Sequence, residues 1–93
     1  MIRSFRDRTT GAVFNGLCPK GFPADIFAVA RRKLRAVHVA GRLDDLRVPP
    51  GNNLEALKGD REGQHSIRIN DQWRICFRWT PEGPTNVEIV DYH

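Results

Sequence analysis

The sequence centres on Gln64-His65-Ser66-Ile67-Arg68-Ile69-Asn70-Asp71-Gln72-Trp73-Arg74-Ile75-Cys76-Phe77-Arg78-Trp79, where apolar and polar residues alternate on both sides of a polar turn. Alternation with a period of two is typical of half-buried β-strands. Asn and Asp favour turns, because they tolerate left-handed backbone and hydrogen-bond locally. The segment therefore predicts two antiparallel strands, 66–70 and 73–79, joined by a turn at 70–72.

The two faces of this predicted hairpin differ in chemistry. The core side is predicted to carry Trp73, Ile75, Phe77 and Trp79. The opposite face is predicted to carry Cys76 and a row of arginines, namely Arg68, Arg74 and Arg78. Positive charge fixed on a rigid sheet attracts anions. We therefore expect that face to be open and basic.

Size and charge limit the possibilities further. A chain of 93 residues suits one domain, 1–93, and the net charge of +4 favours an anionic partner such as nucleic acid, an acidic protein or a lipid surface. Cys18 and Cys76 match no metal or redox spacing and are expected to be reduced thiols. No apolar run has the length of a signal peptide or a membrane span. We expect a cytoplasmic protein with no membrane partner.

The amino-terminal half predicts two helices. Residues 24–40 form the clearer one, because an apolar stripe recurs at helical spacing between Pro23 and Gly41. Residues 7–17 predict a weaker helix with Val13, Phe14 and Leu17 on one face. The basic run 31–35 in the longer helix is either a solvated face or an RNA-docking face.

The remaining segments predict further strands at 2–5, 54–58 and 86–90. Helices followed by a run of antiparallel strands imply an α+β domain. We expect two amino-terminal helices packed on one face of a curved antiparallel β-sheet.

Several residues that such a sheet could bring together have the chemistry for metal-free RNA cleavage. They are Glu55, Lys58, Arg68, Arg74, Asp91, Tyr92 and His93. Lys and Arg can stabilise charge developing on a phosphodiester. A histidine can exchange a proton near neutral pH, and a tyrosine can stack on a base. No phosphate loop or metal-binding spacing is present in the sequence, so we expect no metal and no cofactor. A terminal Asp-Tyr-His can equally be ordinary surface.

The sequence resembles the HigB branch of the RelE/ParE superfamily, the small bacterial toxins of type II toxin–antitoxin modules. The resemblance lies in Leu54-Glu55-Ala56-Leu57-Lys58-Gly59-Asp60-Arg61, Gly63-Gln64-His65-Ser66-Ile67, Asn70-Asp71-Gln72-Trp73-Arg74-Ile75 and Val90-Asp91-Tyr92-His93. It is closest from about residue 53 to 93 and looser before that.

The resemblance implies a ribosome-dependent endoribonuclease that cleaves mRNA in the ribosomal A site and arrests growth. The implied partner is a helix-turn-helix antitoxin of the HigA type, and operator DNA would be bound only through that complex. By position, Lys58 and Arg74 would bind the scissile phosphate, and His93 would transfer a proton. Tyr92 would orient the nucleotide and Asp91 its neighbours.

Other details of the resemblance bear on the site. Arg68 and Arg78 would contribute to RNA binding. Glu55 stands where well-known HigB-type toxins carry a histidine, and a carboxylate there could act as a base or hold Lys58 in place. Two other functions stay open: a non-enzymatic ParE-like inhibitor of DNA gyrase, and an inactive module that only binds its antitoxin.

Overall fold

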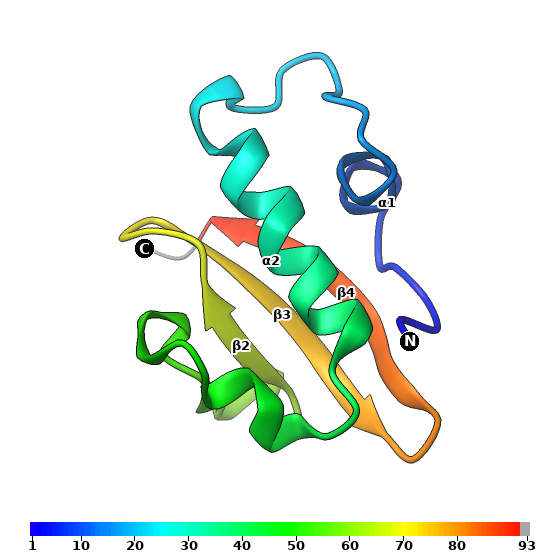
Figure 1. The fold of residues 1–93 in the computed structure, drawn as a ribbon, viewed down its shortest axis with the longest axis vertical. Coiled ribbons are helices and arrows are strands. Elements are labelled where there is room, and N and C mark those ends of the chain that lie inside the picture. The colour runs from blue at the N-terminus through cyan, green and yellow to red at the C-terminus, as the bar shows by residue number, and fades with distance from the viewer. Residues whose placement is uncertain (92–93) are drawn as a thin grey trace.

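The computed structural model describes residues 1–91, and it has two helices against a four-stranded antiparallel sheet (Figure 1). The helices are α1, Arg8–Phe14, and α2, Phe27–Val39. The strands lie side by side in the order β1, Glu55–Ala56; β2, His65–Arg68; β3, Trp73–Thr80; and β4, Gly83–Asp91. The predicted α+β class is confirmed.

The central hairpin forms as its alternation predicts. β2 pairs antiparallel with β3, and Ile67 lies opposite Ile75. The side chain of Asn70 closes the turn, because its Oδ1 accepts hydrogen bonds from the backbone N–H groups of Gln72 and Trp73, both at 2.8 Å. β2 itself ends at Arg68, two residues earlier than predicted.

The core lies between α2 and the sheet. Leu34 and Val37 of α2 are completely buried, as are Ile75 and Phe77 of β3. The apolar stripe that predicted the longer helix therefore faces the apolar side of the hairpin. The two tryptophans are half-buried and pack against this core, which confirms the side of the sheet predicted for them.

The first helix is shorter than predicted. The Asp7 carboxylate caps α1 by accepting a hydrogen bond from the Thr10 N–H at 2.7 Å. The helix stops at Phe14, because Gly16 follows with a φ of +88°, a left-handed conformation that glycine adopts easily. Leu17 is therefore 64% exposed, and its predicted place on the buried helix face was wrong.

The outer strands differ in length from the predictions. The segment 2–5 is no full strand: it makes one parallel bridge, Phe5 to Val87, along the free edge of β4. β1 spans only two residues of the predicted 54–58. β4 is longer than predicted and contains an irregularity at Asn86, whose φ is +51°.

Candidate active site

The most constrained charged group in this region is the guanidinium of Arg74 in β3. Its Nε donates a hydrogen bond to Ser66 Oγ at 2.8 Å, and its Nη2 donates one to the Asn53 carbonyl, also at 2.8 Å. The same Nη2 lies 3.3 Å from Glu55 Oε1. Because the residue is only 8% exposed, these contacts fix the plane of the guanidinium.

Strand register brings these groups together. Glu55 lies opposite Ser66, and Arg68 lies opposite Arg74. Directly paired residues of antiparallel strands share one face of the sheet, here the face away from the core. The register therefore places a carboxylate, a hydroxyl and two guanidinium groups in two neighbouring cross-strand residue pairs.

The remaining contact to Arg74 comes from the turn before β1. Asn53 has a φ of +47°, a left-handed conformation that asparagine tolerates. The preceding Asn52 is buried, and its Nδ2 donates to the carbonyls of Leu46, at 3.1 Å, and Val48, at 3.2 Å. Its Oδ1 accepts a hydrogen bond from Lys33 of α2. This side chain thus holds the turn that presents the Asn53 carbonyl.

The expectation of an open row of arginines was wrong. Arg74 is buried, and Cys76 is completely buried. Acidic groups share this face, since Glu88 pairs with Cys76 across β3 and β4. Arg68 forms an ion pair with Asp71. The face is therefore a network of paired charges rather than a uniform positive surface.

The more exposed predicted residues lie around this network. Lys58 follows the buried Leu57 and precedes a single 3₁₀ turn, Gly59–Arg61. Within residues 1–91 its ammonium group makes no hydrogen bond or ion pair, so it can reach a ligand without breaking one. Arg78 is exposed, and its Nη1 lies 3.5 Å from the Gly63 carbonyl.

The end of β4 places Asp91 on the other side of the sheet. Asp91 pairs with Trp73, whereas Val90 pairs with Arg74, so the Asp91 carboxylate and the Arg74 guanidinium leave opposite faces. Asp91 Oδ2 accepts a hydrogen bond from Gln72 Nε2 at 3.1 Å. Both pairs lie at the same end of the sheet. The predicted partners Tyr92 and His93 lie outside the described residues.

Two groups near the site have perturbed pKa values. Burial raises the pKa of the Cys76 thiol, and Arg61 and Arg74 oppose that shift while Glu88 adds to it. Burial lowers the pKa of Lys33, and the positive charges of Arg32 and Arg68 lower it further. The thiol is therefore held neutral near neutral pH.

Sequence reasoning missed the residues that hold Arg74. Ser66 and Asn53 have ordinary polar side chains, and their role is seen only once β2 pairs with β3 and the turn before β1 is in place. The position of Ser66, which alternates with Arg68 on the polar side of a predicted strand, could have indicated that it lies on the same face as the arginines. Nothing in the local pattern marks Asn53, whose backbone carbonyl makes the contact.

The chemistry available at this face is recognition of an anion by positioned cations. A buried, oriented guanidinium and an exposed ammonium in the segment after Glu55 suit a phosphate group. Among residues 1–91, no cluster of three or more His, Cys, Asp and Glu side chains could hold a metal ion. In the same range, no helix is long and apolar enough to cross a membrane.

Comparison with known proteins identifies the family. Residues 3–93 match the family described as RelE-like toxin of type II toxin-antitoxin system HigB. The chain is 31% identical over its full length, and over all of the relative, to a Proteus vulgaris protein named Endoribonuclease HigB. It is 44% identical over 57 residues to Toxin HigB-1 of Vibrio cholerae, and 35% identical over 57 residues to an uncharacterized Haemophilus influenzae protein.

These last two matches cover 61% of this chain, and 60% and 56% of the respective relatives. The family match, by contrast, takes in the paired strands, the Arg74 network and the turn that carries Lys58. The chain therefore belongs to the HigB-like family of RelE-like toxins of type II toxin–antitoxin systems.

Proposed function

We propose that this chain is a ribosome-dependent, metal-independent endoribonuclease that cleaves mRNA in the ribosomal A site. The 2′-oxygen of a ribose attacks the adjacent phosphorus, and the bond from phosphorus to the 5′-oxygen breaks. The 2′-hydroxyl gives up its proton and the leaving 5′-oxygen gains one, so the products are a cyclic phosphate and a 5′-hydroxyl. DNA lacks the attacking hydroxyl, so this chemistry selects RNA.

The observation that carries the proposal is the fixed guanidinium of Arg74. Arg74 is held by Ser66, Asn53 and Glu55, so it need not reorganise as charge develops on the phosphate. Lys58 adds a second cation from the segment that follows Glu55. The full-length relative named Endoribonuclease HigB supports the same assignment.

Glu55 has a different role in this proposal from the one expected. Its carboxylate lies 3.3 Å from Arg74 Nη2, and it is a side chain that holds Arg74 rather than Lys58. We therefore assign proton transfer to the terminal group, with His93 as the acid or base, Tyr92 orienting the nucleotide and Asp91 positioning its neighbours.

The other parts of the proposal follow from the family. The chain acts as a single domain, 1–93, in the cytoplasm, where ribosomes and mRNA are present. Its cognate antitoxin is a helix-turn-helix protein of the HigA type, and operator DNA is bound only by the toxin–antitoxin complex. Arg68 and Arg78 contribute to RNA binding from the same face of the sheet as Arg74.

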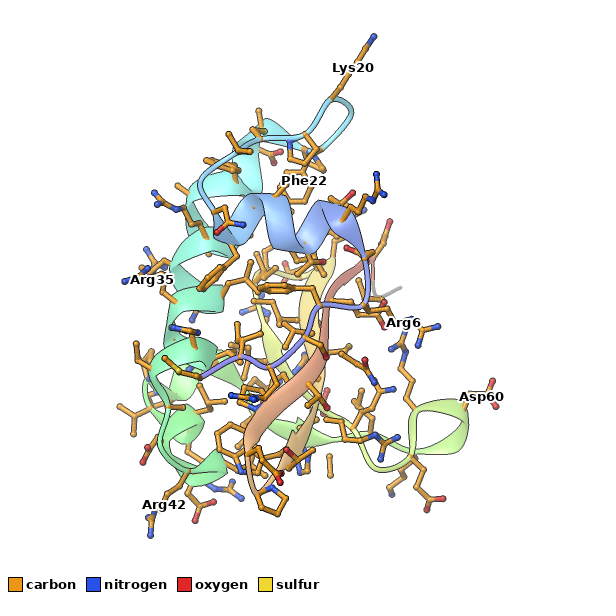
Figure 2. The ribbon with its side chains drawn as sticks, turned by 90° about the vertical axis from the view of Figure 1, so that its right-hand side faces the viewer. Arg6, Lys20, Phe22, Arg35, Arg42 and Asp60 are labelled. Atoms are coloured by element: carbon orange, nitrogen blue, oxygen red, sulfur yellow. The ribbon has the colours of Figure 1, made fainter. Side chains whose placement is uncertain are left out.

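The test is primer extension on ribosome-bound mRNA with the wild type, Lys58→Ala and His93→Ala. We expect A-site cuts from the wild type and a loss of roughly 10²-fold or more in kcat for either variant, the order seen when one stabilising group is removed. Lys20→Ala is the matched control, because it removes an exposed lysine from the loop before α2 (Figure 2).

The opposite outcome is equally clear. Intact mRNA in growth-arrested cells, with toxicity that survives the combined Lys58→Ala and His93→Ala substitutions, would overturn the proposal and indicate gyrase inhibition. Harmless expression of the wild type without any antitoxin would overturn it in favour of an inactive binding module.

A further inference from the structure

Lys58 belongs to a loop that is fastened to the sheet at a second place. This Lys58 loop, residues 57–64, joins β1 to β2 and is closed by a hydrogen bond from the Leu57 N–H to the Gln64 carbonyl at 2.9 Å. In Figure 2 its Asp60 turn projects on the side of the sheet away from the helix that carries Arg35. Its backbone hydrogen bonds, such as Leu57 to Gln64 and Gln64 to Arg61, join residues of the loop to one another.

Arg61 supplies the second attachment. Its Nη1 lies 2.7 Å from Glu88 Oε1 in β4 and 3.1 Å from Gln64 Oε1 within the loop. Its backbone N–H donates to the Lys58 carbonyl at 3.3 Å. The residue that reaches across the sheet thus lies in the same turn as Lys58.

Glu88 is well placed to hold such an attachment. Its side chain is only 13% exposed, and that of Arg61 is 33% exposed. A carboxylate in this setting is costly to leave without its cation. Arg6 also approaches Glu88, but at 3.9 Å and with a side chain that is 63% exposed. Arg61 is therefore the main counter-charge that Glu88 has among the described ion pairs.

The attachment connects to the Arg74 network. Strand register places Glu55, Ser66, Cys76 and Glu88 in one row across the four strands. Glu55 and Ser66 hold Arg74 at one end of this row, and Glu88 holds Arg61 at the other. The Lys58 loop follows Glu55 in the chain, and the side chain of its Arg61 contacts Glu88 at the other end of the row.

We propose that the Arg61–Glu88 ion pair positions Lys58 against the phosphate that Arg74 binds. The inference rests on the proposed function. Arg61 and Glu88 are positioning residues and do not touch the RNA. When the pair is broken, the loop still forms but the Lys58 ammonium samples many places, and small misplacements of a catalytic group are costly.

The test compares kcat and KM for cleavage of ribosome-bound mRNA. Arg61→Ala and Glu88→Gln should each lower kcat by about 10- to 100-fold, with KM changed by less than about threefold. The two substitutions together should lower kcat no further than either alone, because both break one ion pair. Arg61→Lys keeps the charge and should recover part of the loss.

Two controls separate positioning from direct RNA contact. Arg6→Ala removes a positive charge beside the same carboxylate at the longer distance, and it should leave kcat unchanged. Glu88→Gln keeps Arg61 and removes the negative charge beside it. If Arg61 bound RNA directly, this substitution would lower KM or leave it unchanged and would not reduce kcat. That result would overturn the proposal.

A readout independent of cleavage uses the thiol of Cys76. It is completely buried and lies beside Glu88 in the row. In a Cys18→Ser background, Arg61→Ala should raise the rate of Cys76 alkylation at least severalfold, whereas Arg6→Ala should not. Faster alkylation with unchanged kcat in an active enzyme would overturn the positioning role. A wild type that cuts no mRNA would instead overturn the proposed function. The alkylation rates would then still show whether the Arg61–Glu88 ion pair fastens the Lys58 loop to the sheet.

Discussion

Ser66→Ala tests how much the fixed guanidinium depends on a single hydroxyl. The Ser66 Oγ accepts the hydrogen bond from Arg74 Nε at 2.8 Å, and both residues are buried. Alanine removes the acceptor and adds no bulk, so the backbone of β2 can stay in place. The substitution leaves a buried charged donor without this partner.

The expected cost follows from the charge on the donor. Hydrogen bonds to charged groups contribute about 1.5–3 kcal/mol, and the other contacts of Arg74 remain. We therefore expect the free energy of unfolding to fall by about 2 kcal/mol. For a domain of this size that corresponds to a decrease in Tm of about 10 °C.

The assay is a double-mutant cycle by chemical denaturation. Ser66→Ala is measured in the wild type and in an Arg74→Met background, which keeps an unbranched apolar side chain and removes the guanidinium with its charge and donors. The cost of Ser66→Ala should fall to less than about 0.5 kcal/mol in that background. An equal cost in both backgrounds would refute the reasoning, because the loss would then come from packing and not from the hydrogen bond.

Two further predictions concern the core and the buried thiol. Leu34→Ala should lower the free energy of unfolding by about 2–5 kcal/mol because Leu34 is completely buried, whereas Leu17→Ala, at a 64% exposed residue, should change it by less than about 0.5 kcal/mol; denaturant titration measures both. The Cys76 thiol has a folded-state pKa raised above its ordinary value of 9.0, so the stability it contributes is present below pH 9.0 and is lost as pH rises through that value toward the folded pKa. The wild type should therefore lose stability relative to Cys76→Ala above pH 9.0, by at most about 1.4 kcal/mol per pH unit, and a constant difference between the two curves would contradict this. The pKa of Lys33 is lowered, so its effect on stability has the opposite pH dependence: stability rises as pH rises from the folded pKa toward 10.5. Both proteins contain Lys33, so this effect cancels when the wild type is compared with Cys76→Ala.

The sequence was most informative where one pattern determines both local structure and packing. In the segment 64–79, alternation gives the strands, Asn70 gives the turn, and the same alternation selects Ile75 and Phe77 for the core. The helix at 24–40 was predictable for the same reason, since its apolar stripe repeats at helical spacing. Its first turn, Ala24–Ile26, is 3₁₀.

The site was less predictable, because it depends on pairing between distant segments. Alternation correctly put Arg74 on the polar face, but it could not show that Glu55 and Ser66 would enclose it. β1 has only two residues, too few to give a pattern of its own. The ion pair between Arg61 and Glu88, which spans 27 positions, left no local signal either.

The contact between Glu55 and Arg74 also bears on the departure from well-known HigB-type toxins, which carry a histidine at this position. A neutral imidazole could not offer Arg74 Nη2 a negative partner, whereas the carboxylate at 3.3 Å does. Glu55 therefore contributes to positioning Arg74, the arginine that we propose binds the phosphate. Our proposal assigns proton transfer to the terminal group, and His93→Ala is therefore the decisive variant for the proposed reaction.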